Sequence, residues 1–131
     1  MLAALGWAAT KRLPILFVVE DNNLAILTQK HVRRSWTITA AAEGLGLSAE
    51  DTTDHPGNLF KRLQWAWERL PALLNVETHR KFWHAGAGVD DPDIFDRHHE
   101  VSDHLDGGYV MDVRFAALQR VGEAWARHCG T

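Results

Sequence analysis

An almost unbroken apolar run over residues 13–19 ends abruptly in four polar side chains, Glu20, Asp21, Asn22 and Asn23. Such a run, rich in β-branched residues, predicts a parallel strand that is buried on both faces. Ligands of open α/β sheets bind just outside the carboxyl ends of the strands, so a site is expected at this polar turn. The local alternative is an ordinary strand end, because Asp and Asn favour turns without any ligand.

Helical patterns recur on either side of this run. Residues 2–11 have the propensity of a helix with a cationic carboxyl end. Residues 37–46 indicate a short helix with Thr37 as its N-cap and glycines at its end. Residues 59–70 carry apolar side chains three and four apart, which predicts an amphipathic helix capped by Asn58.

A further apolar run over 72–78 predicts a second buried strand. A long helical pattern follows over 110–128. Strands that alternate with helices are typical of the α/β class with a mostly parallel sheet.

Composition narrows the class of protein. With 131 residues, the chain has room for a single domain over 1–131. A net charge of −3 and the lack of a basic stripe argue against nucleic acid as a partner. The first residues form neither a signal peptide nor a membrane span, and a lone cysteine, Cys129, is typical of intracellular proteins. A cytoplasmic protein without a membrane partner is expected.

The polar turn provides oxygen atoms as possible ligands. Carboxylates, amide carbonyls and turn backbone suit a hard cation such as Mg²⁺, which usually keeps phosphate oxygens among its ligands. A basic run over 30–36 follows. It is either solvated surface or a contact to phosphate or to a partner.

Residues 5–26 resemble the thiamine-diphosphate-binding region of 2-oxo acid dehydrogenase E1 α subunits, of the transketolase-like superfamily. In that family an apolar strand leads into Glu-Asn-Asn-Gly-Tyr-Ala-Ile. The second asparagine ligates Mg²⁺ and the residue two further on lends a backbone carbonyl. With Glu20 and Ala25-Ile26 as anchors, these positions are Asn22 and Leu24.

The resemblance therefore implies metal ligands at Asn22 and Leu24, and cofactor contacts from Asp21, Asn22, Leu24 and Ile26. Asp21 replaces the first asparagine of the family motif, and Leu24 replaces its tyrosine. Asn23 replaces the glycine and should adopt its left-handed backbone, which Asn tolerates better than most residues.

A second stretch, 77–88, resembles the family's Glu-x-Thr-Tyr-Arg-x-x-x-His loop, with Thr78, Arg80 and His84 in register. The resemblance places His84 at the diphosphate and the reacting centre, where an imidazole suits electrostatics and proton transfer. By itself His84 is one histidine of eight, at the end of a strand. The family's regulatory serine is replaced by Ala85, so phosphorylation is not expected there.

The resemblance also assigns residues that lie between these two stretches. It implies a short strand over 47–50 and a turn over 51–58.

The family's first motif, Gly-Asp-Gly, would lie just before Met1. The resemblance thus covers only the second half of a thiamine-diphosphate-binding domain: a partial three-layer α/β/α fold that lacks its first half. The missing aspartate is the other protein ligand of Mg²⁺, so the chain should bind the cofactor poorly alone. The resemblance therefore implies two partners: one that carries Gly-Asp-Gly, and a β-type subunit that supplies the activating glutamate.

The resulting hypothesis is a component of a split or truncated thiamine-diphosphate-dependent enzyme. It would act on 2-oxo acids or ketols by decarboxylation and acyl or ketol transfer. The alternative is an inactive structural or interaction subunit, a remnant of such an enzyme. A zinc site is a third possibility, but its spacings match no recognised ligand pattern; its candidates are His79, His84, His98, His99, His104, Asp90, Asp91 and Cys129.

Overall fold

The computed structural model describes residues 1–82 and 95–129, and these form two compact units, Met1–Phe95 and Asp96–Thr131. The expectation of a single domain over 1–131 stays a prediction, and each unit is described by itself. The elements of the first unit, in chain order, are α1 (Leu2–Lys11), β1 (Leu16–Asp21), β2 (Leu24–Ala25), β3 (Thr28–Gln29), α2 (Lys30–Arg33), α3 (Ile38–Gly44), β4 (Ser48–Thr53), α4 (Pro56–Trp67) and β5 (Ala72–Glu77).

The main sheet of this unit is three-stranded and parallel, in the order β1-β5-β4. Strand β5, which the sequence placed at 72–78, is the central one and is buried from Ala72 to Val76. Its residue Ala72 pairs with Leu16 of β1 and with Ser48 of β4. The predicted α/β class and parallel sheet are therefore confirmed.

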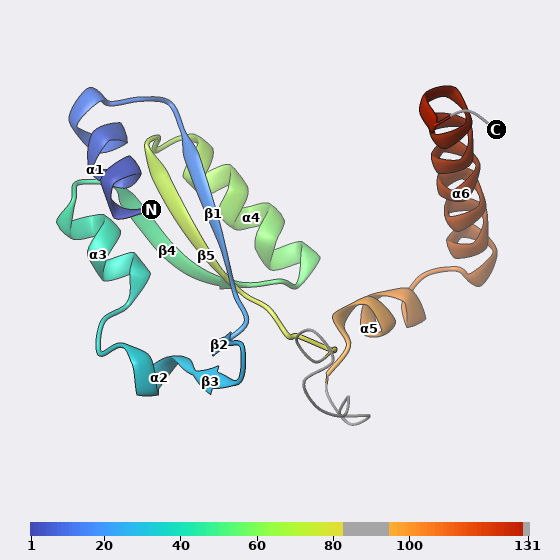
Figure 1. The fold of residues 1–131 in the computed structure, drawn as a ribbon, viewed down its shortest axis with the longest axis horizontal. Coiled ribbons are helices and arrows are strands. Elements are labelled where there is room, and N and C mark those ends of the chain that lie inside the picture. The colour runs from blue at the N-terminus through green and yellow to red at the C-terminus, as the bar shows by residue number, and fades with distance from the viewer. Residues whose placement is uncertain (83–94, 130–131) are drawn as a thin grey trace. The chain divides into compact units, whose positions relative to one another are not determined.

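Helices cover both faces of this sheet (Figure 1). Successive side chains of a strand point to opposite faces, so neighbours on β5 enter different cores. Leu73 packs with Leu5 of α1 and Ile38 of α3, whereas Leu74 packs with Ala66 of α4. The two connections, β1 to β4 and β4 to β5, run in opposite directions across the sheet, and their helices lie on opposite faces.

Strand β1 differs from its prediction. It begins at Leu16 rather than at residue 13, and Val18 is 53% exposed, so the strand is not buried on both faces. Within the described residues β1 pairs only with β5, which leaves it at the edge of the sheet. Apolar parallel strands are normally buried on both faces by other parts of the protein. Strand β1 therefore presents an exposed apolar edge within the described residues.

Two helix starts show how local chemistry sets boundaries. Thr37 caps α3 as predicted, since its Oγ1 accepts a hydrogen bond from the N–H of Ala40 at 3.1 Å. The predicted cap Asn58 is wrong. Helix α4 begins at Pro56, a residue suited to the first helical turn, and His55 Nδ1 caps it by accepting from the Gly57 N–H at 3.2 Å.

The turn expected over 51–58 is also shorter than predicted. Strand β4 continues to Thr53, which pairs with Glu77 of β5. Thr52 and Thr53 have a high strand propensity but Asp51 is unfavourable in strands, so pairing with β5 decides this extension.

The second unit contains α5 (Arg97–Asp103) and α6 (Gly107–Cys129). The helix predicted over 110–128 is thus confirmed, with a start three residues earlier, where Asp106 Oδ1 accepts from the Tyr109 N–H at 2.9 Å. No residue of α6 is buried. Across residues 1–82 and 95–129, no helix is both long enough and apolar enough to traverse a membrane.

We expect Leu73→Ala to lower the free energy of unfolding by about 2–5 kcal/mol, because Leu73 is fully buried in the central strand. Urea unfolding followed by circular dichroism measures the change. Phe60→Ala on α4 is the control: Phe60 is mostly exposed, and the loss should stay below about 1 kcal/mol. Equal losses in the two variants would mean that the sheet is not the core of this unit.

Candidate functional site

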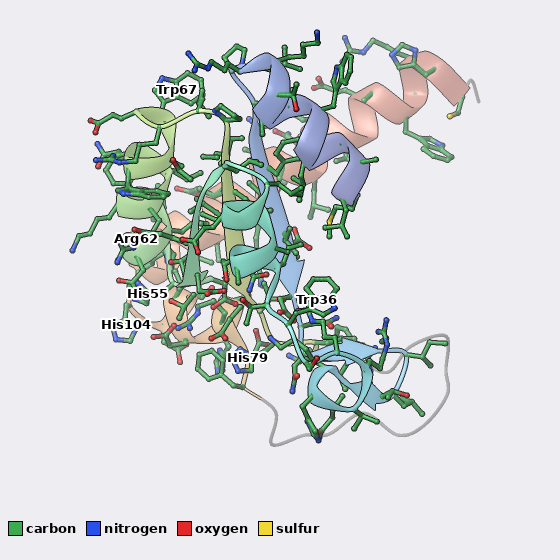
Figure 2. All side chains as sticks on the ribbon, turned by 90° about the vertical axis from the view of Figure 1, so that its left-hand side faces the viewer. Trp36, His55, Arg62, Trp67, His79 and His104 are labelled. Atoms are coloured by element: carbon green, nitrogen blue, oxygen red, sulfur yellow. The ribbon has the colours of Figure 1, made fainter. Side chains whose placement is uncertain are left out.

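A hollow of ≈ 330 Å³ lies at the carboxyl end of β1, where a site was expected. Its wall is formed by the end of β1, the polar turn and the basic segment that follows the hairpin. Trp36, at its rim, lies at the opposite end of the unit from Trp67 (Figure 2). The lining residues are Val19, Glu20, Asp21, Asn22, Asn23, Leu24, Lys30, Arg33, Arg34 and Trp36.

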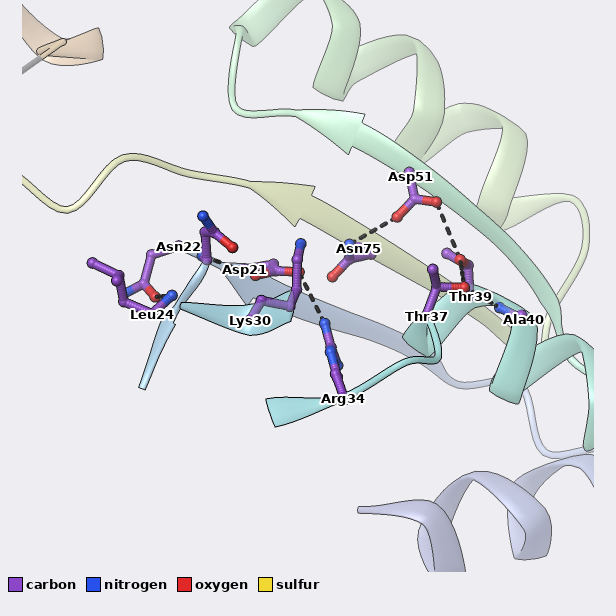
Figure 3. Close-up of polar contacts among 11 residues, drawn as sticks. Asp21, Asn22, Leu24, Lys30, Arg34, Thr37, Thr39, Ala40, Asp51 and Asn75 are labelled. Atoms are coloured by element: carbon purple, nitrogen blue, oxygen red, sulfur yellow. Dashed lines mark hydrogen bonds and ion pairs between the residues drawn. The ribbon is translucent and has the colours of Figure 1, made fainter. Parts of the chain in front are cut away.

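Asp21 is the centre of this wall (Figure 3). Its Oδ2 contacts Lys30 Nζ at 2.6 Å and Arg34 Nη2 at 3.2 Å, and its Oδ1 accepts from the Asn23 N–H at 3.0 Å. The side chain is only 9% exposed. The sequence left two interpretations of the basic run, solvated surface or a contact to phosphate or a partner. Neither of them included an ion pair with Asp21 of the same chain.

These contacts keep Asp21 ionised. Burial alone would raise the pKa of Asp21, but it is outweighed by the hydrogen bond and charge of Lys30, the Asn23 N–H and the amide of Asn75. The pKa of this carboxyl therefore lies below its usual value. Because two cations already share the carboxylate, Asp21 acts first as an anchor for the basic segment.

The polar turn adopts the backbone that the sequence predicted. Asn23 has φ 62°, the left-handed conformation expected of the residue in the glycine position. Asn22 Oδ1 accepts a hydrogen bond from the Leu24 N–H at 3.0 Å, so the local turn of the alternative interpretation is present as well. A carboxamide oxygen has two lone pairs, and one remains for a further partner.

A small hairpin follows, which the sequence did not predict. Strands β2 and β3 pair antiparallel, and the Lys30 N–H donates to the Asn23 carbonyl at 2.8 Å. This return places Lys30 over Asp21. Ile26 lies at the hairpin tip, with φ 57° and an exposed side chain, a strained backbone for a β-branched residue.

The second predicted motif reaches the same edge of the sheet. The Thr78 N–H donates to the Asp21 carbonyl at 3.1 Å, which ties the end of β5 to the end of β1. A second hollow is lined by residues of both motifs, among them Asn22, Leu24, Thr78 and Arg80. His79 of this segment packs edge-on against Phe95, with ring centroids 5.0 Å apart (Figure 2).

His84 lies outside the described residues, so its predicted role is a prediction only. Asp90 and Asp91 of the zinc alternative lie there too. Within the described ranges 1–82 and 95–129, no three His, Cys, Asp or Glu side chains are grouped so that they could hold a metal ion.

A polar network that the sequence did not reveal runs along the α3 face of the sheet (Figure 3). The Thr39 hydroxyl donates to Asp51 Oδ2 at 3.1 Å and lies 3.1 Å from the Thr37 hydroxyl. Asn75 Nδ2 donates to Asp51 Oδ1 at 2.8 Å. The pairing of β4 with β5 brings Asn75 to Asp51, and the packing of α3 on β4 brings Thr39 there, so no spacing in the sequence could have indicated these contacts.

Comparison with known protein families, with curated proteins and with solved structures finds no match for this chain. Its function is therefore inferred from the residues at the strand ends and from the resemblance of the two motifs to the E1 α family.

Asp21→Asn should lower the free energy of unfolding by about 1–3 kcal/mol at neutral pH, because Lys30 and Arg34 lose their counter-charge. A lowered native pKa means that the carboxylate stabilises the fold above the unfolded-state pKa of about 3.9, and that this contribution disappears as the pH falls through the native pKa. The difference between variant and parent should accordingly shrink on acidification. Thermal unfolding between pH 7 and pH 2 measures it.

Glu20→Gln is the control for this experiment, since Glu20 is the exposed neighbour of Asp21 on the same strand. It should change stability little at any pH. A gap between Asp21→Asn and the parent that is independent of pH would contradict the ion pairing.

Proposed function

We propose that this chain is an E1 α-like component of a thiamine-diphosphate-dependent enzyme that acts on 2-oxo acids or ketols. One observation carries the proposal: the turn with Asn22 and Leu24 and the segment with Thr78 and Arg80 line one hollow at the carboxyl edge of a parallel sheet. The two stretches are separated by about 50 residues of sequence, counted from Leu24 to Thr78. Their meeting is what two halves of one cofactor site require.

The fit to Mg²⁺ can be tested on the donor atoms. Asn22 Oδ1 keeps one lone pair beside its bond to the Leu24 N–H. With the Leu24 carbonyl, the chain would offer two neutral oxygens, whereas Mg²⁺ sites usually contain a carboxylate. Asp21 is engaged by two cations and does not fill that role. The proposal therefore requires a carboxylate from a partner chain, the one with the Gly-Asp-Gly motif.

The fit to a diphosphate rests on charge. The hollow at the end of β1 is lined by Lys30, Arg33 and Arg34 against Glu20 and Asp21, which leaves one positive charge in excess. Arginine and lysine bind phosphate oxygens well, and backbone N–H groups of a tight turn add to this.

Each part of the chain would have a distinct task in the assembled enzyme. Bound thiamine diphosphate supplies the carbanion chemistry needed to decarboxylate a 2-oxo acid or to cleave a ketol. Asn22 and Leu24 hold the metal, and the basic segment orients the diphosphate. His84 exchanges protons near the reacting centre, in keeping with the pKa range of imidazole. The glutamate that activates the cofactor comes from a β-type subunit.

The uncovered edge of the sheet supports the need for a partner. Ile15 and Val18 expose apolar surface along β1, and no described strand pairs with its outer side. A further strand added there by the partner would extend the parallel sheet and bury these residues. A cytoplasmic location is in keeping with a single cysteine, Cys129.

An inactive structural remnant is the second candidate, and one observation favours it. The carboxamide of Asn22 and the carboxylate of Asp21 already have partners within the chain, so the turn is stable without a metal. Such a remnant would assemble with partners but lack turnover. The two experiments below separate it from the enzyme.

Asn22→Ala should weaken the binding of Mg²⁺ and thiamine diphosphate by the assembled complex at least about tenfold. Mutation of a residue that only hydrogen-bonds to a metal ligand already lowers metal affinity by about that factor. Isothermal titration calorimetry of the complex measures it. Asn58→Ala is the control, because Asn58 is an exposed residue on α4 whose side chain donates a hydrogen bond to Thr53 Oγ1 at 3.2 Å. Unchanged cofactor affinity in Asn22→Ala would remove Asn22 as a ligand and favour the remnant.

His84→Ala should lower turnover of a 2-oxo acid about 100-fold, a typical loss for a group that transfers protons, with assembly intact. Steady-state kinetics and size-exclusion chromatography of the complex measure the two properties. His98→Ala, an exposed histidine of α5, is the matched control. Full activity in His84→Ala would leave this histidine without a catalytic role.

A further inference from the structure

The carboxyl end of the α3 face carries a set of acceptor groups apart from the proposed metal ligands. Asn75 of β5 lies opposite Asp51 of β4, and Glu77 follows two residues later on the same face. On the other side of β5, Asp21 occupies the corresponding position next to Glu77. The floor of this region therefore consists of three carboxylates around one carboxamide.

The Asn75 side chain is buried, yet only one of its two polar atoms has a hydrogen-bond partner. The residue is 4% exposed, and its Nδ2 donates to Asp51 Oδ1 at 2.8 Å. Its Oδ1 has no hydrogen-bond partner within the part of the chain that the structure describes. Buried polar atoms nearly always have a partner, and leaving one without a donor is costly. A donor from outside the chain would fill this position.

Asn75 faces a hollow of ≈ 340 Å³, large enough for a small molecule. In Figure 3 its amide lies between the Asp21 cluster and the chain of Asp51, Thr39 and Thr37. Trp36 also lines this hollow, together with Lys30 and Arg34 of the basic segment. Asn75 thus borders a cavity, although less than 1 Å² of its orphaned oxygen is exposed, so a donor in the hollow reaches this atom once the neighbouring side chains shift.

The charges of this hollow are unevenly compensated. Lys30 and Arg34 are both engaged by Asp21. Asp51 receives only neutral hydrogen bonds, and neither it nor Glu77 forms an ion pair within residues 1–82 and 95–129. Two carboxylates and one carboxamide oxygen therefore lack a cationic donor.

We propose that this hollow binds the primary ammonium group of a small molecule. An ammonium has three N–H donors and a positive charge, so it would donate to Asn75 Oδ1 and to Asp51 while it neutralises the excess negative charge. A neutral hydroxyl would supply one donor and no charge. A metal ion fits less well, because the described residues contain no group of three metal-ligating side chains. This inference does not depend on thiamine diphosphate.

The test is a titration of the full chain with ethylammonium chloride in the absence of cofactor. Resonances of the Asn75 side-chain amide, followed by ¹⁵N NMR and assigned with Asn75→Leu, report on binding. Tetramethylammonium chloride has the same charge without an N–H donor and should leave this resonance in place. Ethylammonium should shift it in a saturable manner.

Asp51→Asn supplies the matched variant, since Asp51 is exposed and the change keeps its size. Ethylammonium affinity should fall about tenfold or more, because a charged hydrogen bond is lost. Asn58→Ala should leave the affinity unchanged. If Asn75→Leu does not fold, selective ¹⁵N-asparagine labelling with Asn22→Ala, Asn23→Gly and Asn58→Ala assigns the resonance by elimination, because these are the other three asparagines of the sequence.

Three outcomes would overturn the proposal. They are the absence of a saturable shift at Asn75, equal shifts with tetramethylammonium, and unaltered affinity in Asp51→Asn. Displacement of ethylammonium by Mg²⁺ would likewise assign the hollow to a metal ion. None of these results would bear on Asn22, so failure here is distinguishable from failure of the cofactor proposal.

Discussion

The structure at the carboxyl end of the sheet depends on two partly buried ion pairs that share one carboxylate, Asp21 with Lys30 and Asp21 with Arg34. The carboxylate closes the first strand, and the cations belong to a segment that returns over it through a hairpin. Removal of one partner from such a pair costs more than the pair itself contributes, because the other charge stays behind without compensation. The hairpin and the polar turn are thus held by the same three side chains, and two of these, Asp21 and Lys30, line all three hollows.

Local patterns predicted the elements whose stability is local. The first helix, over 2–11, has the bounds that its composition indicated, and Asn23 adopts the left-handed backbone expected from its place in the motif. The start of α4 escaped prediction because His55 is an uncommon cap, although Pro56 was a usable signal. The hairpin escaped because Ile26 occupies a left-handed position that normally calls for glycine or asparagine.

Features that depend on strand order were beyond the reach of the sequence. The bond between Asn75 and Asp51 exists only because β4 and β5 pair in one particular register. Likewise, the apolar run of β1 predicted burial on both sides, but Val18 belongs to an edge strand and its cover is not among the described residues. The position of the candidate site needed less information, since any parallel strand that ends in polar residues brings them to the same edge.

Strand β5 is the last strand of the sheet in sequence and the central one in space. During synthesis, β1 and β4 therefore leave the ribosome without a pairing partner, because each of them bonds only to β5 within the described sheet. The nascent chain must hold two strand segments unpaired, the apolar β1 and the more polar β4, until Ala72–Glu77 emerges, and then close long loops to reach both. Early segments of this kind are natural clients for chaperones, and a stop in translation before Ala72 would yield an aggregation-prone product rather than a smaller folded one.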